Sequence, residues 1–367
     1  MKKVVVGISG GVDSSVAALL LKKQGYDVIG LFMRNWDTSL NGDFLGNPDI
    51  DNNICPQEQD YNDAKEVCNK LDIPLYRIDF VKEYWDYVFT YFLDELKKGR
   101  TPNPDIMCNK YIKFDMFLSE AEKLGADFVA TGHYARLKDG KLMRGIDDNK
   151  DQTYFLSQVS KEKLKKILFP VGDLKKEEVR KIALEYDLIT AKKKDSTGIC
   201  FIGKRNFFEF LQNYIPNKPG KIIDINSKKI LGKHLGTMYY TIGQNKNLHL
   251  AGQNQKYYVC KKDVSKNYLY VCQQNKKNKY LMSNKCLIKD FNFINNYSSK
   301  NKSKFLKVRF RHLQKLNKVL SFMKIKKDNY WTLRYVNTLA VTPGQYAVIY
   351  DRNICIGGGK IEKVYEN

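Results

Sequence analysis

A stretch of glycine, serine and aspartate near the start of the chain has the composition of a phosphate site. It follows an apolar run, precedes a helical pattern, and reads Gly7-Ile8-Ser9-Gly10-Gly11-Val12-Asp13-Ser14. Adjacent glycines and serines at a helix N-terminus form a concave set of N–H donors that suits a phosphate or pyrophosphate. The stretch lacks the Gly-Lys-Ser/Thr ending of a Walker A loop and the spacing of a dinucleotide fingerprint. The alternative is a glycine turn in front of an ordinary helix.

A first cysteine stands in a segment that could make its thiol reactive. Cys108 follows Asp105 by three residues, in a stretch that Pro102 and Pro104 would stiffen into a defined loop. The carboxylate could exchange a proton with the thiol, and the positive charge of Lys110 would favour the thiolate.

A second cysteine, Cys200, lies between Gly198 and Gly203, after three consecutive lysines. In a loop of small residues its sulfur could be reached. For either cysteine alone, an inert thiol in the core is an equally good alternative.

The elements that must position these residues alternate between strands and helices in the first third of the chain. Buried apolar runs predict strands over residues 3–9, 27–33, 75–80 and 126–133. Helical spacing predicts helices from Val12 to about Gly25 and over residues 60–71, 83–97 and 114–124, with a loop over residues 35–56. This order is typical of an open parallel sheet covered by helices.

The pattern changes after about residue 138. A hairpin is predicted at residues 138–141, followed by helices over residues 161–169 and 175–186. Short strands follow over residues 221–225, 257–261, 268–273, 305–310, 319–325 and 345–350, which indicates a small all-β barrel or sandwich. We therefore predict three domains, covering residues 1–214, 215–289 and 290–367.

The net charge of +23 indicates a polyanionic partner such as nucleic acid. Between residues 256 and 327 the only acidic residues are Asp263 and Asp290, among many lysines. The alternative is a lysine bias of AT-rich coding, but such a bias would not also remove the acidic residues. The partner cannot be named from charge alone.

Composition also bounds the compartment and the metal chemistry. No apolar run approaches the roughly 20 residues that span a bilayer, and the first residues do not form a signal peptide. We expect a cytoplasmic protein without a membrane partner. The eight cysteines form no CxxC pair, so we expect reduced thiols and no structural metal.

Together these segments resemble the bacterial tRNA-specific 2-thiouridylases, the MnmA/TrmU family. The glycine-serine stretch is similar to the PP-loop signature SGGxDS of enzymes that split ATP into AMP and pyrophosphate. The segments around Cys108 and Cys200 match the family nearly letter for letter, as do residues 130–136, 150–156 and 342–345. The resemblance covers the whole chain, and the segment around Cys108 is specific to the family.

The resemblance implies an α/β fold with an N-terminal PP-loop domain, which is Rossmann-like and of the adenine nucleotide alpha hydrolase type. A small β-rich central domain that binds tRNA and a C-terminal β-barrel-like domain would follow. The implied enzyme is a tRNA-uridine 2-sulfurtransferase that adenylates O2 of the wobble uridine, U34, and replaces it with sulfur. ATP with Mg²⁺, tRNAs reading Lys, Glu and Gln codons, and a persulfide donor such as a cysteine desulfurase or a sulfur relay protein are the implied partners.

The resemblance also assigns roles to residues. Gly7 to Ser14, Met33 and Gly132 would line the ATP site. Cys200 would carry the persulfide, and Asp105 would help to activate the attacking sulfur. Cys108 would release the sulfur and close a transient Cys108–Cys200 disulfide. The residues implied to contact tRNA are Asn103, Pro104, Asp105, His133, Lys150, Asp151, Gln152, Arg309, Phe310, Arg311 and Gln345.

One segment departs from the family, and three alternatives remain. Residues 243–252 carry Asn245, Asn247 and His249 where the family has more glycine and an arginine, which leaves the tRNA contacts of the central domain open.

The alternatives are a small-molecule amidating synthetase of the argininosuccinate or GMP type, a non-catalytic RNA-binding protein, and an enzyme with an iron–sulfur cluster on Cys108, Cys200 and Asp105. Two cysteines and a carboxylate are a thin ligand set for a cluster.

Overall fold

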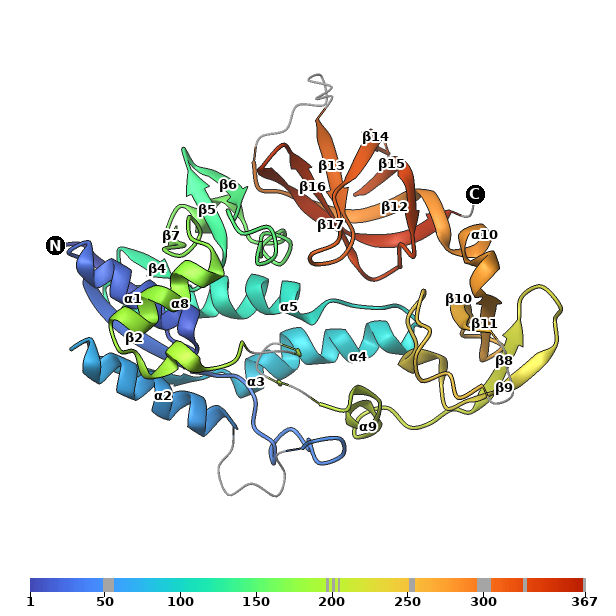
Figure 1. Ribbon diagram of the computed structural model, residues 1–367, viewed down its shortest axis with the longest axis horizontal. Coiled ribbons are helices and arrows are strands. Elements are labelled where there is room, and N and C mark those ends of the chain that lie inside the picture. Colours follow the sequence, from blue (N-terminus) through green and yellow to red (C-terminus); the bar gives the residue numbers. More distant parts are fainter. Residues whose placement is uncertain are drawn as a thin grey trace.

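The computed structural model describes residues 1–48, 56–195, 198–199, 202–203, 205–250, 255–295, 305–325 and 329–365. A parallel sheet with helices on both faces lies at the N-terminal end, and two β-rich parts lie beyond it (Figure 1). Within the described part of the chain, no helix is long and apolar enough to cross a membrane.

The N-terminal sheet has the strand order β3-β2-β1-β4-β7 and is parallel throughout. Its strands are β1 (Lys3–Gly7), β2 (Asp27–Arg34), β3 (Leu75–Asp79), β4 (Phe128–Ala130) and β7 (Ile167–Leu168). This arrangement confirms the predicted open α/β sheet.

Successive residues of β1 are buried on opposite faces, as strand geometry requires. Val4 and Val6 pack in one core cluster with the helices α1 (Val12–Lys23), α2 (Pro56–Lys70) and α8 (Lys176–Glu185). Val5 packs in the other cluster, with the helical run α3 (Val81–Tyr84), η1 (Trp85–Phe89), α4 (Thr90–Lys97), α5 (Pro104–Met107), η2 (Cys108–Met116) and α6 (Phe117–Lys123). Because both faces are covered, β1 carries no polar side chain from Val4 to Gly7, which is why the sequence there is a continuous apolar run.

Two local expectations were wrong. Residues 161–169 were expected to be one helix, but α7 covers only Lys161–Leu164, and Ile167 pairs with Val129 as part of β7. The stretch around Cys108 was expected to be a loop. It is instead the start of a helix, since Asn103 caps α5 and Pro104 occupies its first turn, where its missing N–H costs nothing.

The central part is a four-stranded sheet of order β10-β11-β8-β9. Its strands are β8 (Gly220–Asp224), β9 (Ile230–His234), β10 (Tyr257–Asp263) and β11 (Tyr268–Gln273). The short helices in and around it are α9 (Phe207–Gln212), η4 (Thr237–Tyr239), η5 (Gln274–Lys276) and α10 (Lys277–Leu281), while η3 (Ile189–Lys192) packs in the N-terminal part with α1 and α8.

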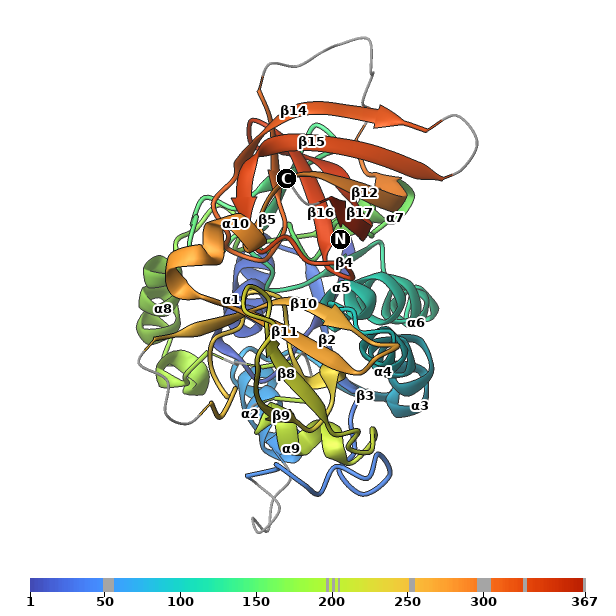
Figure 2. The ribbon, with the colours of Figure 1, turned by 90° about the vertical axis from the view of Figure 1, so that its right-hand side faces the viewer.

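The C-terminal strands close into a barrel, since β12 pairs with both β15 and β17. The order is β12 (Met282–Phe293), β15 (Tyr330–Leu339), β14 (Asn317–Lys324), β13 (Leu306–Arg309), β16 (Tyr346–Asp351) and β17 (Ile354–Tyr365). The hairpin of β5 (Ala135–Lys138) and β6 (Lys141–Arg144) extends this sheet from the N-terminal part, through the pairing of Met143 with Ile354. Figure 2 shows the barrel above the central sheet. The predicted barrel is confirmed, and the exact boundaries near residues 214 and 290 stay predictions.

Candidate functional site

The glycine-serine loop lies at the edge where the parallel strands end. It leaves β1 at Gly7 and enters α1 at Val12, next to the ends of β2 and β4. The chain turns to opposite sides of β1 here, because β2 lies on one side and β4 on the other. In open α/β sheets, such a switch point is where ligands bind.

The backbone of this loop requires glycine at position 10. Gly10 has φ +69°, and a Cβ there would lie 2.2 Å from the carbonyl oxygen of Asp60. The hydroxyl of Ser14 accepts the amide N–H of Ser9 at 3.1 Å and donates to the carbonyl of Gly11 at 3.0 Å. The loop is therefore held in one shape by its own side chains, while the first amides of α1 remain at its mouth.

Met33 and Gly132, the other residues assigned to ATP, border this loop. A Cβ on Gly132 would lie 2.7 Å from the backbone nitrogen of Ser14, so the chain after β4 touches the start of α1. Met33, at the end of β2, is buried and places its Cε 3.8 Å from where a Cβ of Gly7 would stand. The structure thus brings the predicted ATP residues together, and their contact with ATP stays a prediction.

Asp13 is the centre of a charged cluster at the mouth of the loop. Its carboxylate accepts the hydroxyl of Tyr134 at 2.7 Å and the ammonium of Lys176 at 2.7 and 2.9 Å. Lys176 also bonds Asp195 at 2.8 Å, and Asp195 accepts Lys150 at 2.6 Å. Partial burial alone would raise the pKa of Asp195, but the bonds from Lys150 and Lys176 dominate and lower it to about 2.

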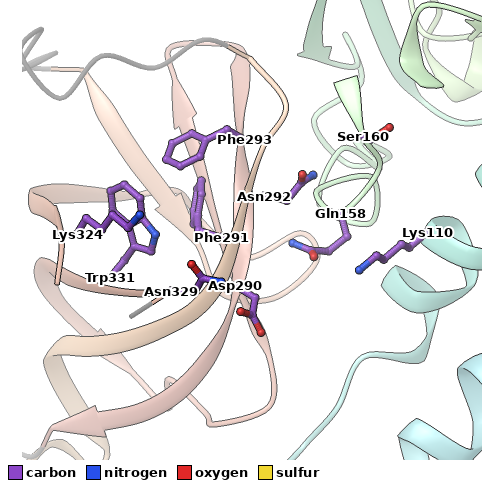
Figure 3. Close-up of a pocket in the computed structure, with 10 residues that line it drawn as sticks. All are labelled: Lys110, Gln158, Ser160, Asp290, Phe291, Asn292, Phe293, Lys324, Asn329 and Trp331. Carbon is purple, nitrogen blue, oxygen red and sulfur yellow. The ribbon is translucent and has the colours of Figure 1, made fainter. Parts of the chain in front are cut away.

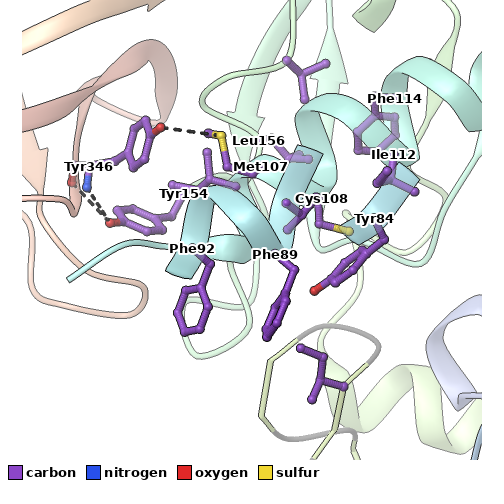
Figure 4. Packing of buried hydrophobic residues seen from close by; sticks show 14 of the residues in the cluster. Tyr84, Phe89, Phe92, Met107, Cys108, Ile112, Phe114, Tyr154, Leu156 and Tyr346 are labelled. Carbon is purple, nitrogen blue, oxygen red and sulfur yellow. Dashed lines mark hydrogen bonds between the residues drawn. The ribbon is translucent and has the colours of Figure 1, made fainter. Parts of the chain in front are cut away.

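Cys108 is the first residue of a π-helical segment and is fully buried. It belongs to the core cluster that contains Tyr84 and Phe89, and Figure 4 shows its side chain on the side where Tyr84 lies, opposite to Tyr346 of the barrel. Asp105, one turn earlier, is only partly buried. π-helical segments often mark functional sites, because the wider turn re-aims the side chains that follow it.

Cys200 lies outside the described residues, but its neighbours are placed. Ile202 is buried in the same cluster as Cys108, and Ile199 packs against that cluster. Ile199 and Gly203 form an isolated antiparallel bridge. The chain on both sides of Cys200 therefore meets the core that holds Cys108.

The residues predicted to contact tRNA differ in exposure. Asn103 and Asp105 are partly exposed, Pro104 is buried, and Asn103 Oδ1 accepts the N–H of Ile106 at 3.2 Å. Lys150 is 35% exposed. The side-chain oxygen of Gln152 accepts the backbone N–H of Tyr134 at 2.9 Å.

Other predicted tRNA contacts lie inside the protein. Asp151 is fully buried and binds Arg144 at 3.0 Å and Arg309 at 2.8 Å, while Phe310 packs in the barrel core. Arg311 donates to the carbonyls of Ile242 and Ala340 and so joins the central part to the barrel. These bonds give the residues a structural role that the sequence did not reveal, and their contact with tRNA stays a prediction.

His133 is buried in the N-terminal part and stays neutral. Burial, and to a lesser degree the charge of Lys113, hold the pKa of its imidazole well below 6.5. Its Nδ1 lies 2.8 Å from the hydroxyl of Thr131. His133 can therefore offer hydrogen bonds at neutral pH but no positive charge.

Gln345 fastens the barrel to the segment that leads to Cys108. Its Nε2 donates to the carbonyls of Thr101 at 2.8 Å and Pro102 at 3.2 Å, and the N–H of Thr101 donates to Pro343 at 2.9 Å. The tight fit of Gly344 against Arg100 and Thr101 adds to this contact. The barrel thus sets the position of Asn103 and Asp105.

The family resemblance implies tRNA thiolation, and we expect Gln345→Ala to lower its kcat/KM about tenfold, because the carbonyls of Thr101 and Pro102 lose their donor at a cost of ~1–3 kcal/mol. Gln345→Glu should be worse than Gln345→Ala, since it turns a carboxylate toward the same carbonyls. Steady-state thiolation rates at varied tRNA concentration measure both effects. The exposed Gln24→Ala serves as the control, and a rate for Gln345→Glu equal to wild type would contradict the role of this contact.

A cavity of about 500 Å³ lies between the barrel and the helix that begins at Cys108. Figure 3 shows Lys110 pointing from that helix toward Gln158. Asn292 of the cavity wall donates to the carbonyls of Ser157 and Val159, which ties the barrel to the N-terminal part. The full lining is Lys110, Gln158, Ser160, Asp290, Phe291, Asn292, Phe293, Lys324, Asn329 and Trp331.

Sequence reasoning missed four charged residues around the loop: Lys176, Arg180, Lys193 and Asp195. Lys193 donates to the carbonyl of Gly10 at 2.9 Å and pairs with Asp60 and Asp63. In a lysine-rich chain these residues have no distinctive pattern. The only signal was an isolated aspartate after three lysines, directly before the segment of Cys200. Among the described residues, no three His, Cys, Asp or Glu side chains form a group that could hold a metal ion.

Three family models match the chain in succession. A tRNA methyl transferase HUP domain matches residues 2–204, a tRNA methyl transferase PRC-barrel domain residues 208–273, and an aminomethyltransferase beta-barrel domain residues 283–361. These matches agree with the parallel sheet, the small central part and the antiparallel barrel described above.

Relatives that span the whole chain carry one name. The chain is 57% identical to the tRNA-specific 2-thiouridylase MnmA of Mycoplasmopsis synoviae (strain 53), over 100% of this chain and 97% of the relative. It is also 57% identical to the protein of that name from Mycoplasma capricolum subsp. capricolum, over 99% of each chain. The protein of that name from Ureaplasma urealyticum serovar 10 is 53% identical over 100% of this chain and 97% of the relative.

Proposed function

This chain belongs to the family of tRNA-specific 2-thiouridylases and thiolates tRNA uridine, and we propose that it does so through a uridine adenylate and a persulfide on Cys200. The observation that supports this route is that the chain leading to Cys200 bonds the glycine-serine loop, through Lys193 and the carbonyl of Gly10, while the chain on either side of Cys200 meets the core that holds Cys108. Ser14 and Gly132 close the loop, while Ile199 and Ile202 pack with Cys108.

The first step activates the uridine. ATP, as its Mg²⁺ complex, binds with its phosphates over residues 7–14, where the amides of α1 and the nearby ammonium of Lys176 face developing negative charge. O2 of the wobble uridine attacks the α-phosphorus, and pyrophosphate leaves. An oxygen that is a poor leaving group becomes part of AMP, which is a good one.

The second step replaces the oxygen with sulfur. The terminal sulfur of the Cys200 persulfide attacks C2, and AMP leaves with the former O2. The thiolate of Cys108 then attacks Sγ of Cys200, which breaks the S–S bond, leaves the terminal sulfur on the base and forms a Cys108–Cys200 disulfide. Asp105, one turn before Cys108, accepts the proton of the Cys108 thiol. An external thiol must reduce the disulfide before the next turnover.

The partners follow from this chemistry. A persulfide-generating protein, such as a cysteine desulfurase or a sulfur relay protein, must load Cys200. The tRNAs that read Lys, Glu and Gln codons are the proposed substrates, and the cytoplasm, where tRNA is found, is the proposed compartment. The excess of positive charge supplies salt-sensitive contacts to the tRNA backbone.

The experiment that tests this function supplies ATP-Mg²⁺, a cysteine desulfurase with cysteine, and unmodified tRNA. We expect AMP and pyrophosphate only when tRNA is present, and one 2-thiouridine at the wobble position for each AMP released after full loading of Cys200. ATP splitting that needs no tRNA would favour a small-molecule synthetase. Binding of tRNA with no ATP splitting would favour a non-catalytic RNA-binding protein.

A further inference from the structure

The segment that leads to Cys200 is bonded at three places to the glycine-serine loop and the start of α1. Thr190 Oγ1 donates to Ser15 Oγ at 3.1 Å, and Lys193 Nζ donates to the carbonyl of Gly10 at 2.9 Å. The third link runs through Lys176, whose ammonium lies 2.8 Å from Asp195 and 2.7 Å from Asp13. None of these contacts is between sequence neighbours. They therefore show that the fold brings the chain before Cys200 against the glycine-serine loop.

Three cationic side chains converge on Asp195. Its Oδ1 accepts Lys176 at 2.8 Å and Arg180 at 2.7 Å, and its Oδ2 accepts Lys150 at 2.6 Å. Arg180 also donates to the carbonyls of Ala191 at 2.9 Å and Lys193 at 3.0 Å. One carboxylate thus connects α8 with the loop after β6, and through Lys176 it is linked to Asp13 at the start of α1.

The carboxylate of Asp195 stays charged and keeps its three cationic partners. Three cations surround it, two of them from the same face of α8, where residues four apart are neighbours. Because the pKa of Asp195 lies at about 2, it is charged at every pH at which the enzyme would work. Charge-assisted bonds of this kind are about twice as strong as neutral ones.

We propose that Asp195 is a positioning residue for sulfur transfer, which fixes the chain leading to Cys200 on the loop that binds ATP. This inference rests on the proposed persulfide role of Cys200. Cys200 follows Asp195 by five residues, and a chain of five residues spans at most about 17 Å. Since Asp195 is joined to Asp13 through Lys176, the length of this chain limits how far the persulfide can lie from a uridine activated at the glycine-serine loop.

Asp195→Asn tests this role because asparagine keeps the shape and removes the charge. We expect 2-thiouridine formation to fall about tenfold, while tRNA-dependent release of pyrophosphate stays within about threefold of wild type, since Lys176 keeps its bonds to Asp13. Closure of the Cys108–Cys200 disulfide by a small-molecule oxidant should slow by a similar factor. Asp195→Glu, which restores the charge, should recover part of both losses.

The matched control is Asp187→Asn. Asp187 is 88% exposed and pairs with Lys70 only at 3.8 Å, so this variant should behave as wild type in all three measurements. If Asp195→Asn does not fold, Arg180→Gln removes a partner of the same carboxylate. This variant should likewise lower thiolation while pyrophosphate release stays near that of wild type. When Asp195→Asn and Arg180→Gln are combined in one chain, the loss of thiolation should be no greater than that of the stronger single variant, because both residues belong to one contact network.

Equal losses of pyrophosphate release and thiolation in Asp195→Asn would overturn the inference, since a general defect moves both. Unchanged thiolation and unchanged disulfide closure would overturn it as well. Both outcomes leave the proposed function intact. Absence of 2-thiouridine from the wild-type reaction would instead count against the proposed function itself.

Discussion

Replacing Cys108 by serine is expected to abolish 2-thiouridine formation while tRNA-dependent release of pyrophosphate continues. In the proposed route, Cys108 acts after the uridine is adenylated and after its C2 is attacked. A serine hydroxyl cannot break the S–S bond of the persulfide, so the loss of thiolation should be at least about 1,000-fold. Nucleoside mass spectrometry of the tRNA and a pyrophosphate assay measure the two steps separately.

Cys200→Ser should give the same loss of thiolation for a different reason, because it removes the sulfur carrier. The two variants can be distinguished by intact mass after treatment with the desulfurase. Cys108→Ser should gain one sulfur atom at Cys200, and Cys200→Ser should gain none at that position. If Cys200→Ser still thiolates tRNA, the assignment of the carrier is wrong.

The control for burial is Cys286→Ala in the barrel. Cys286 is as fully buried as Cys108, so its replacement also costs core packing, but Cys286 lies in a different core cluster. Its variant should thiolate tRNA at a rate near that of wild type. Comparable loss of thiolation in Cys286→Ala would mean that unfolding, and not chemistry, explains the effect at Cys108.

Replacing Gly10 by alanine is expected to be the most damaging change in the ATP site. The new Cβ would lie 2.2 Å from a backbone oxygen of α2, in a region of positive φ, so the loop or the helix must move. A displacement of about 1 Å can cost about 100-fold in rate, and we expect at least that loss in kcat/KM for ATP. Titration with a non-hydrolysable ATP analogue should show weaker binding by folded protein.

Gly140→Ala is the matched control for Gly10→Ala. Gly140 has φ +68°, close to the value at Gly10, but a Cβ there meets nothing within 4 Å. It should therefore cause the same backbone strain, about 1–2 kcal/mol, without displacing the loop. An ATP analogue that binds Gly10→Ala as tightly as wild type would show that residues 7–14 do not hold the nucleotide.

The parts of the fold that the sequence predicts are those set by local pattern. The run of valines in β1 and the helical spacing of α1 needed no knowledge of distant residues. The helix expected over residues 161–169 failed after Leu164, because pairing of Ile167 with Val129 outweighs the local helical preference. The start of α5 has its own signal in the sequence, since Asn103 before Pro104 is a strong cap. The prediction of a loop gives more weight to the stiffness of the two prolines.

The residues around the site were harder to predict, because their partners are distant in sequence. Arg309 and Asp151 are 158 residues apart, and Gln345 bonds Thr101 across 244 residues. Family resemblance selected them but could not say that their bonds are internal. Asp195 was visible only as one acidic residue after three lysines, and its importance appears when Lys176, Arg180 and Lys150 are seen around it.

A single turnover without reductant tests the sulfur route most directly. Enzyme carrying one persulfide on Cys200 is mixed with ATP-Mg²⁺ and unmodified tRNA, and both products are counted by mass spectrometry after acid quenching. We predict one Cys108–Cys200 disulfide for each 2-thiouridine formed, and reaction that stops after one turnover. Formation of 2-thiouridine with both cysteines recovered as thiols would contradict the account.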